Sequence, residues 1–213
     1  MSDSARFTMI ETQIRPADVT DVRIHAAMGA VAREKFVPTA AQALAYADVP
    51  VAVAQGRYLL DPRSFAKLVQ LAGVTADDRV LDVGCATGYS SAVLARLAGE
   101  VIALEQDADL VRVASGLLAN VQGKVELAQG GLVDGAKQHA PFDVIFVNGA
   151  IEQVPDTLLA QLAEGGRLVA VLKDGQSRAW LYLKEQGQVG RRPDFDADVP
   201  LLAGFRKATG FVF

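Results

Sequence analysis

The stretch that decides the fold is Val80-Leu81-Asp82-Val83-Gly84-Cys85-Ala86-Thr87-Gly88-Tyr89. It begins as a short apolar run, bends at a turn with glycines four residues apart, and continues into a segment with apolar residues at helical spacing. An acid, Asp82, stands near the end of the apolar run. The order strand, glycine turn, helix is typical of the first unit of an α/β sheet.

Strands and helices alternate outward from this stretch. The pattern predicts strands at 79–83, 101–104, 125–128, 142–147 and 166–172, and helices at 89–97, 110–118 and 156–162. Because the strands are apolar throughout, they are expected to be buried on both faces. The sequence therefore predicts an α/β fold with a doubly wound, mostly parallel, Rossmann-like sheet. Such a sheet binds its ligand at the carboxyl ends of the strands.

The two ends of the chain depart from this alternation. Residues 4–36 are expected to form helices, one of them capped by Thr20 or Asp21, and residues 38–62 an irregular functional loop. Asp61-Pro62 predicts the start of a helix that runs to residue 71. Strands at 179–184, 188–195 and 209–213 are expected to add an antiparallel edge. We predict a single domain, 1–213, with N-terminal helices and a lid loop (1–62), a cofactor-binding core (63–172) and C-terminal strands (173–213).

Composition excludes several classes of function. Of the 213 residues 51% are hydrophobic and 22% charged, and the net charge of −4 gives no electrostatic reason to expect a nucleic acid as partner. No apolar run has the roughly 20 residues that span a bilayer, and no secretion signal is evident, so we expect a cytoplasmic protein. One cysteine, Cys85, and two separated histidines predict no metal site. Nothing in the sequence indicates the oligomeric state.

The turn does not match a dinucleotide site. Such a site places glycines at the first, third and sixth positions, where this chain has Gly84, Ala86 and Tyr89. Two of the three positions fail, which argues against NAD or FAD. The turn instead resembles the glycine-rich motif of class I S-adenosylmethionine-dependent methyltransferases.

The chemistry of S-adenosylmethionine agrees with this resemblance. Gly84 and Gly88 let the backbone approach the methionyl part of the cofactor. The carboxylate of Asp82 can offset the positive charge of that methionyl part. Glu105, at the end of the next strand, can accept hydrogen bonds from both ribose hydroxyls. Two other interpretations stay open: Asp82 braces the turn through backbone amides, and Glu105 is a solvated acid. The remaining residues predicted to bind the cofactor are Cys85, Ala86, Thr87, Gln106, Gly130, Gly131, Leu132 and Asn148.

Over nearly its full length the chain is similar to the protein-L-isoaspartate O-methyltransferase family. The similarity includes Met-Ile-Glu-Thr-Gln-Ile-Arg-Pro at 9–16, Arg-Glu-Lys-Phe-Val-Pro at 33–38, the cofactor turn, Val-Pro-Asp-Thr-Leu-Leu at 154–159 and Gly-Gly-Arg-Leu-Val at 165–169. The resemblance implies methyl transfer from S-adenosylmethionine to a carboxylate of an isoaspartyl residue, the first step in the repair of damaged proteins. The implied partners are isoaspartyl proteins or peptides. A carboxylate is already ionised at neutral pH, so no catalytic base is required.

The chain departs from the family where the substrate is expected. The family usually has Gly-Gln-Thr-Ile-Ser, whereas residues 56–60 read Gly-Arg-Tyr-Leu-Leu. Leu60 therefore takes the position of the serine that helps to hold the substrate carboxylate, and it cannot donate a hydrogen bond. Arg57 either engages a carboxylate or faces solvent, and Tyr58 either supplies a hydroxyl or packs over the cofactor. Together with Asn148, these residues are the predicted catalytic positions.

Two further departures lie at strand ends. Gly130-Gly131-Leu132 replaces the family's Gly-Asp-Gly, whose acid contacts the adenine amino group. Asn148-Gly149-Ala150 replaces Thr-Ala-Ala, and Asn148 either bonds the cofactor or substrate or caps the strand. Three hypotheses follow: an isoaspartyl methyltransferase, a methyltransferase with another acceptor, and a cofactor-binding protein without this chemistry.

Overall fold

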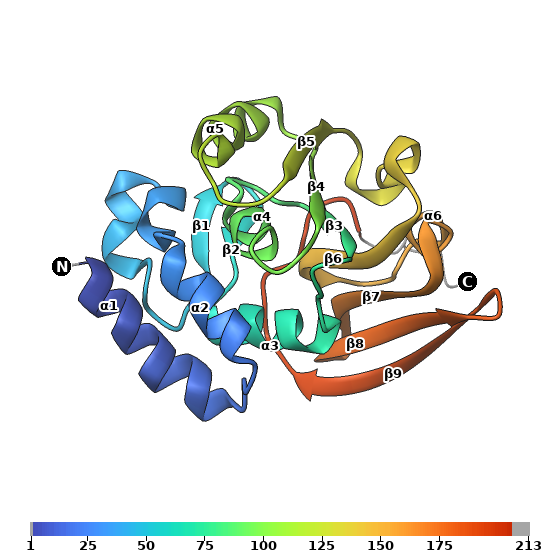
Figure 1. Cartoon of the computed structure of the whole chain (residues 1–213), viewed down its shortest axis with the longest axis horizontal. Helices are drawn as coiled ribbons and strands as arrows, with labels where there is room; N and C mark the ends of the chain where they lie inside the picture. The colour runs from blue at the N-terminus through green and yellow to red at the C-terminus, as the bar shows by residue number, and fades with distance from the viewer. Residues whose placement is uncertain (1, 206–213) are drawn as a thin grey trace, which may run out of the picture.

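A seven-stranded sheet forms the centre of the molecule (Figure 1). The computed structural model describes residues 2–205. The strands of this sheet are β3 (Arg79–Val83), β4 (Glu100–Glu105), β5 (Val125–Gln129), β6 (Phe142–Ile151), β7 (Leu162–Asp174), β8 (Gln176–Glu185) and β9 (Gln188–Asp196). Their order is β5-β4-β3-β6-β7-β8-β9, with parallel pairing as far as β7 and antiparallel pairing beyond it. The predicted parallel sheet and its antiparallel edge are confirmed, while the strand predicted at 209–213 lies outside the described residues.

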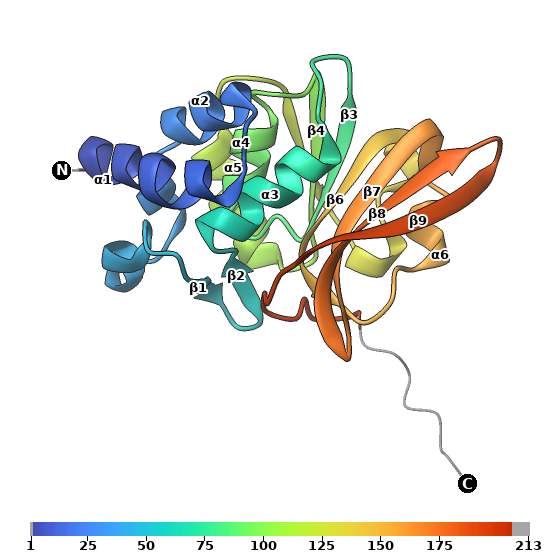
Figure 2. The ribbon, with the colours of Figure 1, turned by 90° about the horizontal axis from the view of Figure 1, so that it is seen from below.

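Helices cover both faces of this sheet. They are α1 (Ser2–Met9), α2 (Val22–Ala30), α3 (Pro62–Ala72), α4 (Tyr89–Leu94), α5 (Ala108–Leu118) and α6 (Asp156–Leu159). A π-helix (Ile10–Ile14) and 3-10 helices at Arg15–Ala17, Arg33–Phe36, Thr39–Leu44, Leu132–Asp134 and Lys137–His139 complete the helical segments. Figure 2 shows α1 to α4 on one side of the sheet and α6 on the other. Among residues 2–205, no helix combines the length and apolarity needed to cross a membrane.

Each face of the sheet has its own apolar core. Val80 and Phe146 pack with the helices α1 to α5, whereas Leu81 and Ile145 belong to the core under α6. Successive side chains of a strand point to opposite faces. Asp82, two residues after Val80, therefore points toward α4, and this alternation decides which groups can reach it.

Asp61 sets the start of α3 as the sequence predicts. Its Oδ1 accepts a hydrogen bond from the Ser64 backbone nitrogen at 2.7 Å, and Pro62 occupies the first turn. Asp21, not Thr20, caps α2 by accepting a hydrogen bond from the Arg23 nitrogen. Both caps satisfy amide groups that have no partner within the helix.

The prediction of an irregular loop at 38–62 is wrong. After the 3-10 helix Thr39–Leu44 the chain forms an antiparallel hairpin of β1 (Val51–Ala54) and β2 (Arg57–Leu59), with Gly56 in the left-handed region (φ 67°) at its turn. Strands of four and three residues are too short to give a clear periodic pattern. This hairpin is a separate sheet, and it places Arg57 and Leu60 beside the cofactor turn.

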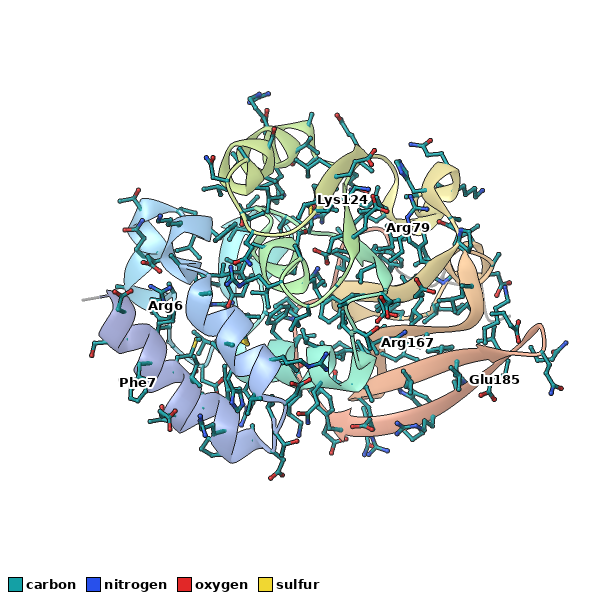
Figure 3. All side chains as sticks on the ribbon, in the orientation of Figure 1. Arg6, Phe7, Arg79, Lys124, Arg167 and Glu185 are labelled. Atoms are coloured by element: carbon teal, nitrogen blue, oxygen red, sulfur yellow. The ribbon has the colours of Figure 1, made fainter. Side chains whose placement is uncertain are left out.

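Ion pairs hold the strands together at their amino ends. Glu100, at the start of β4, is paired with Arg79 at 3.0 Å and with Lys124 at 2.6 Å. Arg167 of β7 binds Asp78 just before β3, with Nη2 and Oδ2 2.6 Å apart. Figure 3 labels Arg79, Lys124 and Arg167. These ion pairs therefore lie at the amino ends of the strands. The cofactor turn lies at the opposite edge of the sheet, after the carboxyl end of β3.

Candidate active site

The turn after β3 has an unusual backbone conformation. Gly84, Ala86 and Gly88 all have positive φ, at 76°, 51° and 94°. The backbone nitrogens of Gly84 and Cys85 donate to the Leu104 carbonyl at 2.9 and 3.1 Å, which binds the turn to β4. A left-handed alanine costs roughly 1 kcal/mol, and such strain is concentrated at functional sites. The conformation supports the predicted binding role of this turn.

Glu105 is the most heavily bonded acid of the site. It is fully buried, which rules out the interpretation as a solvated acid. Its carboxylate accepts hydrogen bonds from the backbone nitrogens of Ala86, Gln106 and Asp107 at 3.1, 2.8 and 3.1 Å. It also accepts two from Arg57, through Nε and Nη2, at 3.1 Å. Because a carboxylate has about four lone-pair sites, it has no capacity left for another donor in this arrangement.

The hairpin brings Arg57 and Leu60 into the interior of the site, whereas Tyr58 lines the cavity beside the turn from a partly exposed position. Arg57 is only 4% exposed and pairs with Glu105, so the interpretation in which it faces solvent is wrong. Tyr58 points to the opposite face of β2 and is 36% exposed. Leu60 is buried, and its carbonyl accepts a hydrogen bond from Arg33 Nη2 at 2.5 Å. The position of the family's serine is thus apolar and fixed.

Asp82 is braced by side chains rather than by backbone amides. Its carboxylate accepts hydrogen bonds from the Ser90 hydroxyl at 2.7 Å, the Ser91 hydroxyl at 2.5 Å and the Asn148 amide. Burial raises the pKa of Asp82 to about 6, against the lowering effect of these three hydrogen bonds, and the negative charge of Glu105 adds to the rise. Neither serine was predicted from the sequence, although two hydroxyls in the first turn of the helix that follows an acidic strand end are a local signal.

Asn148 joins β6 to this network. Besides Asp82, its Nδ2 donates to the Ser90 hydroxyl at 3.0 Å, and the side chain is buried. It therefore contacts the acid beside the turn and does more than cap its own strand. A direct contact with cofactor or substrate stays a prediction.

Thr87 and Cys85 hold the turn in the interior. The Thr87 hydroxyl donates to the Phe36 carbonyl at 2.7 Å and so ties the turn to the N-terminal helical segment. Cys85 is buried, and burial raises the pKa of its thiol well above the usual range, with the carboxylates of Asp82 and Glu105 acting in the same direction. A thiol held neutral in this way does not act as a nucleophile.

An acid lies close to the predicted adenine region although the family's acid is missing there. The Gly130 nitrogen donates to the Glu105 carbonyl at 3.1 Å, and Leu132 is buried. A Cβ atom added to Gly131 would lie 2.5 Å from Oδ2 of Asp134, so that carboxylate occupies the space beside the glycine. Asp134 was not predicted from the sequence, because its carboxylate reaches Gly131 only through the 3-10 helix at Leu132–Asp134.

The space between the turn and residues 58–60 of the hairpin segment is small. A cavity of only about 10 Å³ lies between the turn, Tyr58, Leu60 and Asn148. On the other side, a Cβ atom on Gly84 would lie 3.0 Å from Leu202, which fills that space. Sites for ligands of nucleoside size usually have about 300 Å³ or more. A hollow of about 450 Å³ between α2, α4 and α5 is lined by none of the predicted residues.

The chemistry of the donor set fits S-adenosylmethionine once Arg57 is displaced. Glu105 accepts a two-pronged donor from Arg57, and two adjacent ribose hydroxyls would present donors in a similar way. Asp82 lies on the neighbouring strand, where a carboxylate can balance a cationic methionyl group. Among residues 2–205, no three His, Cys, Asp or Glu side chains cluster in a way that could hold a metal ion.

Comparison with known proteins shows the family of the chain. The family model described as protein-L-isoaspartate(D-aspartate) O-methyltransferase matches residues 5–196. The protein-L-isoaspartate O-methyltransferase of Methylorubrum populi is 38% identical over 96% of this chain and 98% of its own length. The protein of the same name from Koribacter versatilis is 34% identical, over 90% and 86%.

A solved structure has the same fold. It is described as a beta-aspartate methyltransferase from Plasmodium falciparum in complex with S-adenosyl-L-homocysteine, and it superposes with a TM-score of 0.78. The alignment covers 94% of this chain and 97% of that one at 22% identity. Fold and family match together define an S-adenosylmethionine-dependent methyltransferase of the Rossmann-like class. More narrowly, the chain belongs to the protein-L-isoaspartate(D-aspartate) O-methyltransferase family.

Proposed function

We propose that this protein transfers the methyl group of S-adenosylmethionine to a carboxylate of isoaspartyl residues in damaged proteins. The observation that carries the proposal is the pair of buried acids, Asp82 and Glu105, at the ends of adjacent strands around a left-handed glycine turn. Family membership supports the acceptor. The proposal includes the cytoplasm as the compartment, as predicted from the sequence. Cell fractionation tests this part of the proposal.

The residues of the site act by positioning and by excluding water. S-adenosylmethionine would supply the electrophilic methyl group, and the acceptor carboxylate needs no base because it is ionised at neutral pH. The buried leucines 59 and 60 of the hairpin make an apolar wall beside the turn. Such a wall removes water from an anionic nucleophile, which favours its attack on a cationic methyl donor.

Methyl incorporation tests the acceptor. Radiolabelled S-adenosylmethionine is incubated with the protein and an isoaspartyl peptide, and in parallel with the matched aspartyl peptide. The proposal expects label in the isoaspartyl peptide alone. Equal labelling of both peptides would rule out isoaspartyl specificity.

The two ends of β4 offer a matched test of the cofactor site. Glu105→Gln is expected to weaken the binding of S-adenosylhomocysteine by at least about ten-fold, because the ribose loses a charged acceptor. Glu100→Gln is the control, since Glu100 lies at the opposite end of the same strand and pairs with Arg79 and Lys124. If both variants bind as the wild type does, the cofactor site has been placed wrongly.

A second function is favoured by Leu60. A buried leucine at the serine position supports a methyltransferase with another, less polar acceptor. In that case Leu60→Ser creates isoaspartyl methylation or leaves it absent. A fall in activity that the wild type already has would exclude this second function.

A further inference from the structure

The cofactor acid Glu105 is occupied by the protein itself. Arg57 Nε lies within 3.2 Å of both carboxylate oxygens, and Nη2 lies 3.1 Å from Oε1. The side chains of Arg57 and Glu105 are 5% and 0% exposed. Backbone nitrogens take the remaining accepting positions, as described above. A ribose diol therefore cannot bind Glu105 while Arg57 stays in place.

Arg57 is carried by a hairpin that is hydrogen-bonded separately from the central sheet. It is the first residue of β2, and the hairpin of β1 and β2 forms its own two-stranded sheet. Its third guanidinium nitrogen, Nη1, donates to the carbonyl of Gly56 in the hairpin turn at 3.1 Å. The ion pair is thus the bond that ties the tip of the hairpin to the end of β4.

The C-terminal segment closes the same space from the other face. Leu202 fills the volume beside Gly84, and a Cβ atom on Gly56 would lie 3.7 Å from Ala203. The backbone nitrogen of Leu202 donates to the Ala150 carbonyl at 2.8 Å, which fixes this segment along β6. The hairpin turn and the C-terminal segment therefore approach each other at Gly56 and Ala203, on the side of the turn where Leu202 packs against Gly84.

We propose that Arg57 is an intramolecular competitor of the cofactor, which closes the nucleoside site by pairing with Glu105 and must leave before S-adenosylmethionine binds. The inference rests on the proposed function. Arg57 stands where the related family has glutamine, a residue that carries no charge to hold Glu105. When only a fraction of molecules is open, the apparent dissociation constant rises by the inverse of that fraction. The strength of the ion pair between Arg57 and Glu105 would therefore set the cofactor concentration at which the site fills.

Calorimetric titration with S-adenosylhomocysteine tests this competitor. Arg57→Gln, which restores the family residue, is expected to bind at least about ten-fold more tightly than the wild type. Arg57→Lys keeps the charge but loses the two-pronged contact, so its affinity should lie between the two. The control is Arg63→Gln, because Arg63 pairs with Asp48 at 3.6 Å on the surface and should leave the affinity within about two-fold.

A second measurement uses the wild type and does not depend on the folding of a variant. The nitrogen-15 resonance of the Arg57 Nε–H group is identified by its loss in Arg57→Lys or by selective labelling. It is expected to shift on saturation with S-adenosylhomocysteine and to exchange faster with solvent. A resonance that keeps its position and protection in the saturated protein overturns the proposal.

The outcomes separate this inference from the proposed function. Arg57→Gln binding no more tightly than the wild type overturns the competitor and leaves the methyltransferase standing. Absence of binding by the wild type and by both Arg57 variants overturns the two together. Tighter binding by Arg57→Gln, with a shifted Nε–H resonance in the wild type, supports both.

Discussion

The buried acid Asp82 gives the protein a pH-dependent stability with a predictable sign. Its pKa is raised from an ordinary value of 3.8 to about 6 in the folded protein. Each pKa unit corresponds to about 1.4 kcal/mol, so a rise of roughly two units corresponds to about 3 kcal/mol. A raised folded pKa stabilises the protein fully below the unfolded pKa, and this stability is lost as the pH rises through the folded pKa.

Asp82→Asn isolates this contribution, because the amide keeps the shape of the side chain but does not titrate. The free energy of unfolding of both proteins is measured with urea at several pH values from about pH 4 to about pH 7. Relative to the variant, the wild type is expected to lose about 2–2.5 kcal/mol over this range, because part of the total of about 3 kcal/mol is lost below pH 4. A difference between the two proteins that does not change with pH would refute the reasoning.

Asp78 provides a control of opposite sign. Burial raises its pKa, but hydrogen bonds from Arg167 and from the Thr75 backbone, together with the charge of Arg167, lower it to below the ordinary value. A lowered folded pKa stabilises the protein above the unfolded pKa, and this stability is lost as the pH falls through the folded pKa. As the pH falls, the stability of Asp78→Asn should therefore approach that of the wild type, because the wild type loses the stabilisation from Asp78. The stability of Asp82→Asn should instead fall relative to the wild type, because the wild type regains the stabilisation from protonated Asp82.

Three further substitutions test the geometry of the site. Ala86→Gly should raise the free energy of unfolding by about 0.5–1 kcal/mol, because glycine adopts φ of 51° without strain; a loss of stability in urea melts would contradict the strained turn. Leu60→Ser should cost about 2–4 kcal/mol, since it leaves a cavity and buries a hydroxyl; thermal unfolding with no loss would mean that this position is not packed as described. Asp134→Asn should weaken S-adenosylhomocysteine binding about three- to ten-fold if its carboxylate replaces the acid missing at Gly131, and unchanged calorimetric affinity would exclude that role.

The central sheet was predictable because its signals are local. The run 79–83 matches β3 residue for residue, and the caps of α2 and α3 were readable from an acid placed before an apolar segment. The two acids of the site were found for the same reason, since each stands at the end of an apolar strand. Motif and strand pattern therefore predicted the two acids that the structure buries on adjacent strands.

Two partners of these acids, Arg57 and Asn148, were not predictable, because they come from distant parts of the chain. Arg57 meets Glu105 across 48 positions, and Asn148 meets Asp82 across 66. The interpretation of Arg57 as solvent-facing was wrong because nothing in the local sequence shows that it pairs with the buried carboxylate of Glu105. The hairpin that carries Arg57 was missed because its strands have four and three residues.

The buried Cys85 offers a chemical test of whether the site opens. It is the one cysteine in the sequence, and it lines the small cavity beside the turn together with Leu59 and Leu60. A thiol reagent can label it only in molecules whose cleft has opened, so the labelling rate counts openings without any added probe. Ligands, temperature and substitutions in the hairpin can then be compared by a single half-time of modification.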